Sequence, residues 1–72
     1  TGQVGPIGGI PFKLVKARQA GAKAFLVPAQ NCAEAKAHST GDMRLFKVKT
    51  IDDATAALQA LRSDQPKQAP QC

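Results

Sequence analysis

The stretch GPIGGIPFKLVKARQAGAKAFLVPAQN, residues 5–31, holds most of the signals that decide the fold. It opens with a turn rich in glycine, a residue that reaches positive φ without steric cost. Pro11 suits the first turn of a helix, where its missing N–H is no loss, and Gly21 suits a helix end. These signals predict a helix from about Pro11 to Ala20.

The segment after this helix predicts a strand that is covered on both faces. Residues 24–27 are apolar without alternation, as in the interior of a parallel sheet, and Pro28 closes the run. Asn31 then suits the N-cap of a brief second helix that ends around His38, because Glu34 three residues later can complete a capping box.

A strand and a third helix are predicted further on. Residues 44–49 alternate well enough to indicate a strand with one wetter face. Thr50 suits an N-cap, and Asp52 and Asp53 lie in the first turn, where the helix dipole favours acids. The apolar residues that follow recur at steps of three and four, the pattern of an amphipathic helix: Ile51, Ala54, Leu58 and Leu61.

Together with a short strand at residues 3–5, these elements alternate between strand and helix. Such alternation predicts an α/β fold, here a small βαβαβα layer over residues 1–62. Residues 63–72 are polar, contain proline and offer little to bury, so we expect a disordered tail. At 72 residues the chain is long enough for one compact unit.

Composition bounds the function without deciding it. The formal net charge of +5 is compatible with an acidic partner, but the basic residues are dispersed and the three aromatics are all phenylalanine. Phe25 and Phe46 suit a core better than base stacking. Cys32 and Cys72 are too few and too far apart to indicate a metal knuckle or a disulfide framework. His38 has no partner at ligand spacing, so we expect no metal site.

The glycine-rich turn and the lysine after it suggest two kinds of site. Such a turn can hold a phosphate, but residues 5–9 fit neither nucleotide-binding motif. Alternatively, the turn brings Lys13 into a confined site, because the helix aligns it with Ala17 and Ala20. Removing water from a lysine ammonium lowers its pKa and lets the amine act as a general base. Spacing alone favours a solvated lysine head instead.

The sequence VGPIGGIPFKLVKARQAGAKAFLVPAQN resembles the C-terminal half of the Lon-type protease domain. The family pattern has a Gly-Gly pair followed by a lysine, then a strand that ends in Pro-x-x-Asn. The later LFKVKTIDDATAAL is similar to the final strand and helix of that domain, and the likeness covers about residues 2–61. The residues that fall on the pattern are Pro6, Gly8, Gly9, Lys13, Ala17, Arg18, Gly21, Val27, Pro28 and Asn31.

The resemblance implies a serine-type endopeptidase with a serine–lysine dyad, in which Lys13 is the general base. The family's serine lies several dozen residues upstream and is not in this chain; Ser39 and Ser63 have no nucleophile-like context. We therefore expect the chain alone to be inactive. The implied partners are a polypeptide substrate, the upstream half of the same domain and further copies of the protein, with no cofactor and no nucleic acid.

The pair Pro11-Phe12 and the segment NCAEA, residues 31–35, are most similar to bacterial Lon-like proteins that join a membrane anchor and a PDZ domain to the protease domain. This implies a membrane-tethered parent facing outside the cytoplasm, where both cysteines could oxidise; an ATP-dependent member would be cytoplasmic. Two other classes stay open: a non-catalytic α/β interaction module, and a basic nucleic-acid binder whose affinity falls steeply with salt.

Overall fold

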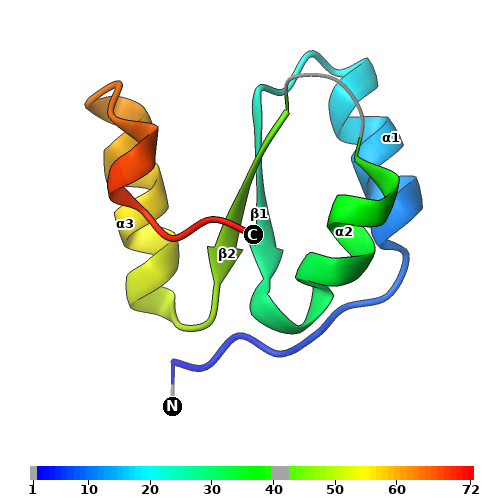
Figure 1. Ribbon diagram of the computed structural model, residues 1–72, viewed down its shortest axis with the longest axis horizontal. Helices are drawn as coiled ribbons and strands as arrows, with labels where there is room; N and C mark the ends of the chain where they lie inside the picture. The colour runs from blue at the N-terminus through cyan, green and yellow to red at the C-terminus, as the bar shows by residue number, and fades with distance from the viewer. Residues whose placement is uncertain (1, 40–42) are drawn as a thin grey trace.

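The computed structural model describes residues 2–39 and 43–72 and has an α/β architecture (Figure 1). The two strands are parallel, with Ala24 opposite Arg44 and Pro28 opposite Val48. None of the helices in these ranges is long and apolar enough to cross a membrane. In chain order the elements are α1 (Ile10–Gln19), β1 (Ala24–Pro28), the 3₁₀ turn η1 (Ala29–Asn31), α2 (Cys32–His38), β2 (Arg44–Val48), α3 (Ile51–Arg62) and the 3₁₀ turn η2 (Pro66–Gln68).

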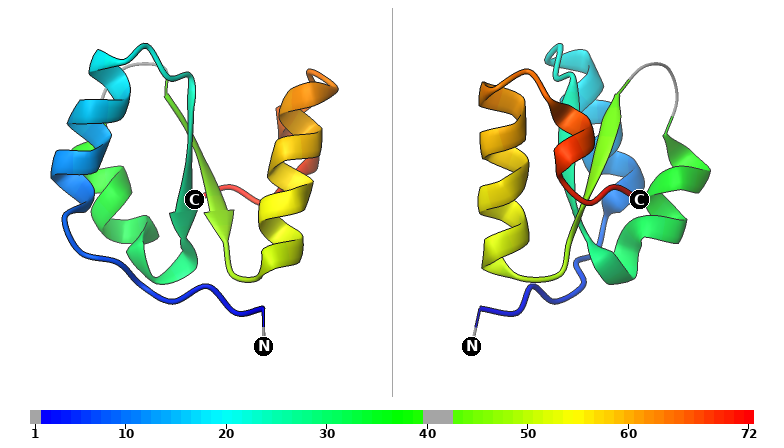
Figure 2. Two further views of the ribbon diagram at one scale, coloured as in Figure 1. Left: turned by 180° about the vertical axis from the view of Figure 1, so that it is seen from behind. Right: turned by 60° about the vertical axis from the view of Figure 1, so that its left-hand side comes forward.

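Helices cover both faces of the strand pair. α1 and α2 lie on one face and α3 on the other, as both views of Figure 2 also show. Each face has its own buried cluster: one consists of Ile10, Leu14, Val27 and Ala35, and the other of Phe46, Ala57, Ala60 and Ala69. Alternate residues of β1 serve the two clusters, which explains the unbroken apolar run of this strand.

α1 begins where the glycine turn ends. Gly9 is its N-cap, with φ of 72° in the left-handed region, and Ile10 is the first helical residue, one position before the predicted start. Pro11 lies in the first turn as predicted, and Gly21 follows the helix with φ of 82°. Both glycines therefore have conformations that a side chain would strain.

α3 begins with the predicted cap. Asp53 N–H donates to the Thr50 hydroxyl, and the Asp53 carboxylate accepts from Thr50 N–H, which completes a capping box. The helix buries its small side chains, Ala57 and Ala60, against Phe46, which is fully buried. The larger residues of the predicted amphipathic pattern face solvent instead: Ile51, Leu58 and Leu61 are 40–58% exposed.

The first predicted strand is reduced to a single bridge. Gln3 pairs antiparallel with Thr50, and Val4 N–H donates to the Lys49 carbonyl at 3.0 Å. Pro6 has no N–H to continue such pairing, and the glycines around it favour a turn. The short strand predicted at residues 3–5 is thus not formed, and among the described residues the sheet consists of β1 and β2.

The segment after α3 is ordered, contrary to the disordered tail that we expected. Lys47 N–H donates to the Pro70 carbonyl at 3.0 Å, and Cys72 N–H donates to the Leu45 carbonyl at 3.1 Å. These bonds place the segment along the edge of β2 that faces away from β1, in antiparallel pairing. Ala69 is buried in the α3 cluster, so the segment covers part of the core.

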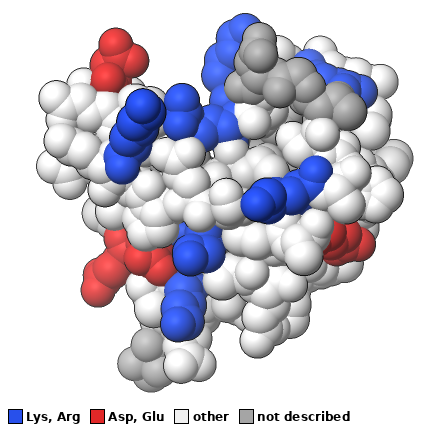
Figure 3. Space-filling model, viewed as in Figure 1, with Lys and Arg blue, Asp and Glu red and all other residues white. Residues whose placement is uncertain are grey.

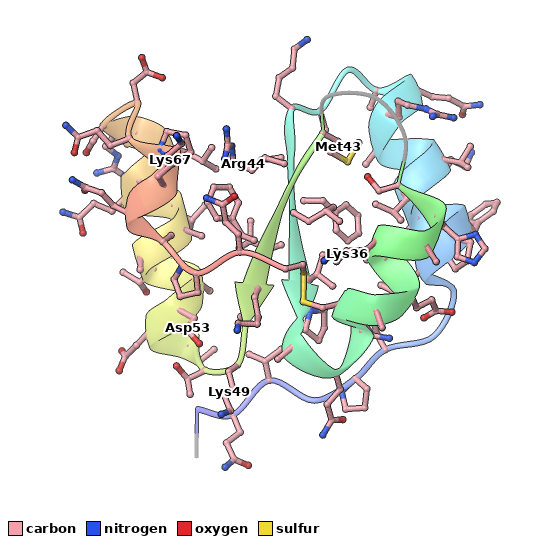
Figure 4. The ribbon with its side chains drawn as sticks, viewed as in Figure 1. Lys36, Met43, Arg44, Lys49, Asp53 and Lys67 are labelled. Atoms are coloured by element: carbon pink, nitrogen blue, oxygen red, sulfur yellow. A yellow bond between two sulfur atoms is a disulfide. The ribbon has the colours of Figure 1, made fainter. Side chains whose placement is uncertain are left out.

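A disulfide joins Cys32, at the start of α2, to Cys72, and appears as the yellow bond in Figure 4. The two Cα atoms are 5.3 Å apart, within the normal range for a disulfide. The sequence interpretation missed this pairing because it treated residues 63–72 as unstructured. The bond links the α2 side of the sheet to the edge of β2.

Candidate active site

Lys13 lies in the first turn of α1, directly after the glycine turn. Its N–H donates to the Gly9 carbonyl at 2.9 Å, which is the first hydrogen bond of the helix. α1 runs antiparallel to β1, so its beginning lies at the end of the sheet where the strands finish (Figure 1). In α/β folds this carboxyl end of the strands is the usual place for ligands.

The side chain of Lys13 is exposed in this chain. Ala17, which shares its strip of α1, is half-buried, and Ala20 is exposed. Lys16 behaves differently: its Nζ lies 5.5 Å from the centre of the Phe12 ring, in a cation–π contact. The confined site considered for Lys13 is therefore not closed by the described residues of this chain, in which the lysine is exposed as spacing alone favoured.

Large apolar side chains are exposed on the same part of the molecule. Phe12 is 66% exposed, Val15 42% and Ile7 39%, and all three belong to α1 or to the turn before it. A single exposed apolar residue needs no explanation, but a group of three around one helix start is typical of a surface that another segment covers. Lys13 belongs to the same helix start.

Asn31, the last residue of η1, connects the carboxyl end of β1 to the glycine turn. Its side-chain oxygen accepts from Ile7 N–H, and its side-chain NH₂ donates to the Ile7 carbonyl, both at 2.9 Å. The NH₂ group also lies 3.3 Å from a Glu34 carboxylate oxygen. The helix that we predicted after Asn31 is confirmed and Asn31 is its N-cap residue, but the predicted capping box is wrong, because this side chain makes no bond to the N–H groups of α2.

The sequence could have indicated this contact only through the family pattern, in which Pro28-x-x-Asn31 recurs together with the glycine turn. Spacing within the chain gives no hint of it, because Ile7 and Asn31 are 24 positions apart. Local reasoning assigned Asn31 to the nearest unpaired donors, those of α2. Its actual partners are the backbone groups of Ile7, in the turn before α1.

A groove of about 240 Å³ lies at the carboxyl ends of the two strands. The first residues of the chain, η1 and the end of β2 form its walls. Its polar side chains carry amides, a hydroxyl and one ammonium. The lining residues are Gln3, Val4, Ala29, Gln30, Lys49 and Thr50.

The remaining candidate residues lie elsewhere. Ser39 and Ser63 are the C-caps of α2 and α3, and α3 is on the opposite face of the sheet from α1 (Figure 2). His38, in the last turn of α2, is exposed. Within residues 2–39 and 43–72, no cluster of three metal-ligating side chains is found.

The basic residues are spread over the molecule. In Figure 3 the lysine and arginine side chains occur from the top to the bottom of this face, over several elements. Four of them are labelled in Figure 4, and they come from separate places in the sequence: Lys36, Arg44, Lys49 and Lys67. Arg44 donates to the side-chain oxygen of Gln71 at 3.0 Å, so this guanidinium holds the C-terminal segment in place.

The comparisons with known proteins agree with this arrangement. The family model described as "Lon protease (S16) C-terminal proteolytic domain" matches residues 1–61. The chain belongs to this family. It is 42% identical over 57 residues to a Lon protease of Campylobacter concisus (strain 13826), across 74% of this chain. The match spans 7% of that relative's length. No solved structure matches the chain significantly.

For a Lon-type proteolytic domain, the observed α/β architecture is the expected one. The match ends at residue 61, just before α3 finishes. Residues 63–72 therefore add an antiparallel segment and a cysteine beyond the matched region of this Lon-type chain. The disulfide joins that addition to the matched part.

Proposed function

We propose that this chain is the part of a serine-type endopeptidase that supplies the general base of a serine–lysine dyad. In this proposal the amine of Lys13 takes the proton of a serine hydroxyl while the serine oxygen attacks the scissile carbonyl of a polypeptide. The serine belongs to the upstream half of the domain, so the chain alone does not hydrolyse peptides.

The observation that carries the proposal is the position of Lys13 at the start of α1, beside exposed Ile7, Phe12 and Val15. A lysine amine must be unprotonated to act as a general base, and exclusion of water favours that uncharged form. We propose that the upstream half packs on these apolar side chains and closes the site over the amine. The groove at the carboxyl ends of the strands then lies at the same end of the sheet as the dyad.

The test uses the complete protease domain and peptide hydrolysis as the assay. Lys13→Ala should abolish hydrolysis while the circular dichroism spectrum stays native. Lys13→Arg should be equally inactive, because a guanidinium keeps its proton in proteins. Lys16→Ala is the matched control: it lies on the same helix and contacts Phe12, and it should retain activity. Hydrolysis by either Lys13 variant would overturn the proposal.

We further propose that the parent protein is a membrane-tethered, PDZ-containing Lon-like protease that assembles with further copies of itself and works outside the cytoplasm. The Cys32–Cys72 disulfide supports that location, since such bonds persist in oxidising compartments. Trapping thiols with an alkylating agent at the moment of cell lysis tests it. If both cysteines are alkylated without prior reduction, the assignment to an oxidising compartment fails.

A further inference from the structure

Asn31 is the buried polar side chain of the described residues, with 7% of its surface exposed. Its amide makes a two-way pair with the backbone of Ile7, accepting from the N–H and donating to the carbonyl, both at 2.9 Å. A peptide group in an antiparallel ladder bonds in the same way. The side chain thus replaces a strand partner for a segment that has none.

The glycine turn has little else to hold it. A Cβ added at Gly5, Gly8 or Gly9 would meet no atom within 4 Å, so the turn is open on the side where a side chain would lie. Across the described ranges, the hydrogen bonds that tie residues 5–8 to other parts of the chain are the two made by Asn31. The amide is therefore the anchor of the turn.

The anchored turn determines where α1 begins. Two residues after Ile7, Gly9 adopts its left-handed conformation, and its carbonyl accepts the N–H of Lys13 at 2.9 Å. Ile10, the first helical residue, is fully buried and fixes the inner side of the same turn. A shift of the turn would move the backbone at Lys13 together with the helix start.

We infer that Asn31 is a positioning residue for Lys13: it fixes the glycine turn and so places the amine where a hydroxyl proton can be transferred. This inference rests on the proposed function. Proton transfer requires donor and acceptor within hydrogen-bond reach, and a misplacement of about 1 Å can lower a rate by about 100-fold. The loss should appear in kcat, because Asn31 itself is buried and does not touch the substrate.

The test compares two variants in the complete protease domain. Asn31→Ala should lower kcat for peptide hydrolysis by about 10- to 100-fold, with KM changed by less than about twofold. Asn31→Asp keeps an acceptor for Ile7 N–H but loses the donor to the carbonyl, so its loss should be smaller. Phe46→Leu is the control, because it weakens the other core cluster without touching the turn. It should leave kcat near that of the wild type.

A kcat for Asn31→Ala no lower than that for Phe46→Leu would overturn the inference, and so would a change confined to KM. Amide hydrogen exchange in the 72-residue chain separates this result from failure of the proposed function. Ile7 N–H should be protected in the wild type and in Asn31→Asp, and unprotected in Asn31→Ala. An unprotected wild-type Ile7 would refute the anchor even if Lys13 proved to be the base. The Asp variant answers the question if the Ala variant does not fold.

Discussion

Reduction of the Cys32–Cys72 disulfide should remove a large part of the stability of this chain. The cysteines are 40 positions apart, so the bond closes a loop of about 41 residues in the unfolded chain. The chain-entropy relation for such a loop gives about 13 cal/mol/K, or about 4 kcal/mol at 25 °C. A domain of this length has a total unfolding free energy of about 4–11 kcal/mol, so the reduced chain should be near its limit of stability.

Urea unfolding followed by circular dichroism, with and without a reductant, measures this difference. A loss of about 4 kcal/mol should also lower Tm by roughly 15 °C or more in a domain of this size. The Cys32→Ser/Cys72→Ser double variant should match the reduced wild type and should not respond to the reductant. Gln71→Ala keeps the disulfide and removes two hydrogen bonds, the one from Arg44 and the one to the Pro66 carbonyl, so it should cost about 1–2 kcal/mol, less than loss of the disulfide.

A change of less than about 1 kcal/mol in the unfolding free energy on reduction would contradict this prediction. Such a result would mean that the folded chain does not depend on closure of the loop between α2 and the β2 edge. Free thiols detected in the folded, unreduced protein would contradict the structure more directly. The thiol titration should therefore precede the unfolding measurements.

Two further predictions concern local structure. Gly9→Ala should destabilise the chain by about 1–2 kcal/mol, because φ at this N-cap is 72°. Gly8→Ala is the control and should change the unfolding free energy by less than about 0.5 kcal/mol. Equal effects of the two variants in thermal melts would rule out strain at Gly9. Thr50→Ala should lower the unfolding free energy by about 1 kcal/mol, because it removes the acceptor for Asp53 N–H. Thr50→Ser keeps the hydroxyl and should cost much less. Thermal melts that show no difference between the two variants would exclude a capping role for Thr50.

The elements that the sequence predicted well depend on contacts between near neighbours. The start of α3 was predictable because Thr50 and Asp53 are three positions apart and cap each other. The double cover of β1 was predictable because the run from Ala24 to Val27 does not alternate. The glycine requirement at Gly9 was predictable for the same reason: the turn and the helix start are adjacent in sequence.

The features that the sequence did not predict depend on partners far along the chain. The amide of Asn31 bonds to the backbone of Ile7 rather than to the N–H groups of the helix that it precedes. The last ten residues pack because the edge of β2 offers them hydrogen bonds, which no local pattern indicates. α3 turns its alanines inward, where Ala57 and Ala60 pack against the large side chain of Phe46. The periodicity of the apolar residues predicted α3 correctly but did not predict which face of the helix is buried.

The antiparallel segment at the C-terminus also has a consequence for self-association. It pairs with Lys47 N–H and the Leu45 carbonyl, groups that would otherwise offer a free strand edge to another molecule. In the oxidised molecule the disulfide keeps the C-terminal segment paired with that edge of β2. In the reduced molecule the segment can detach from β2. The disulfide that stabilises the fold therefore also protects the protein against edge-to-edge aggregation.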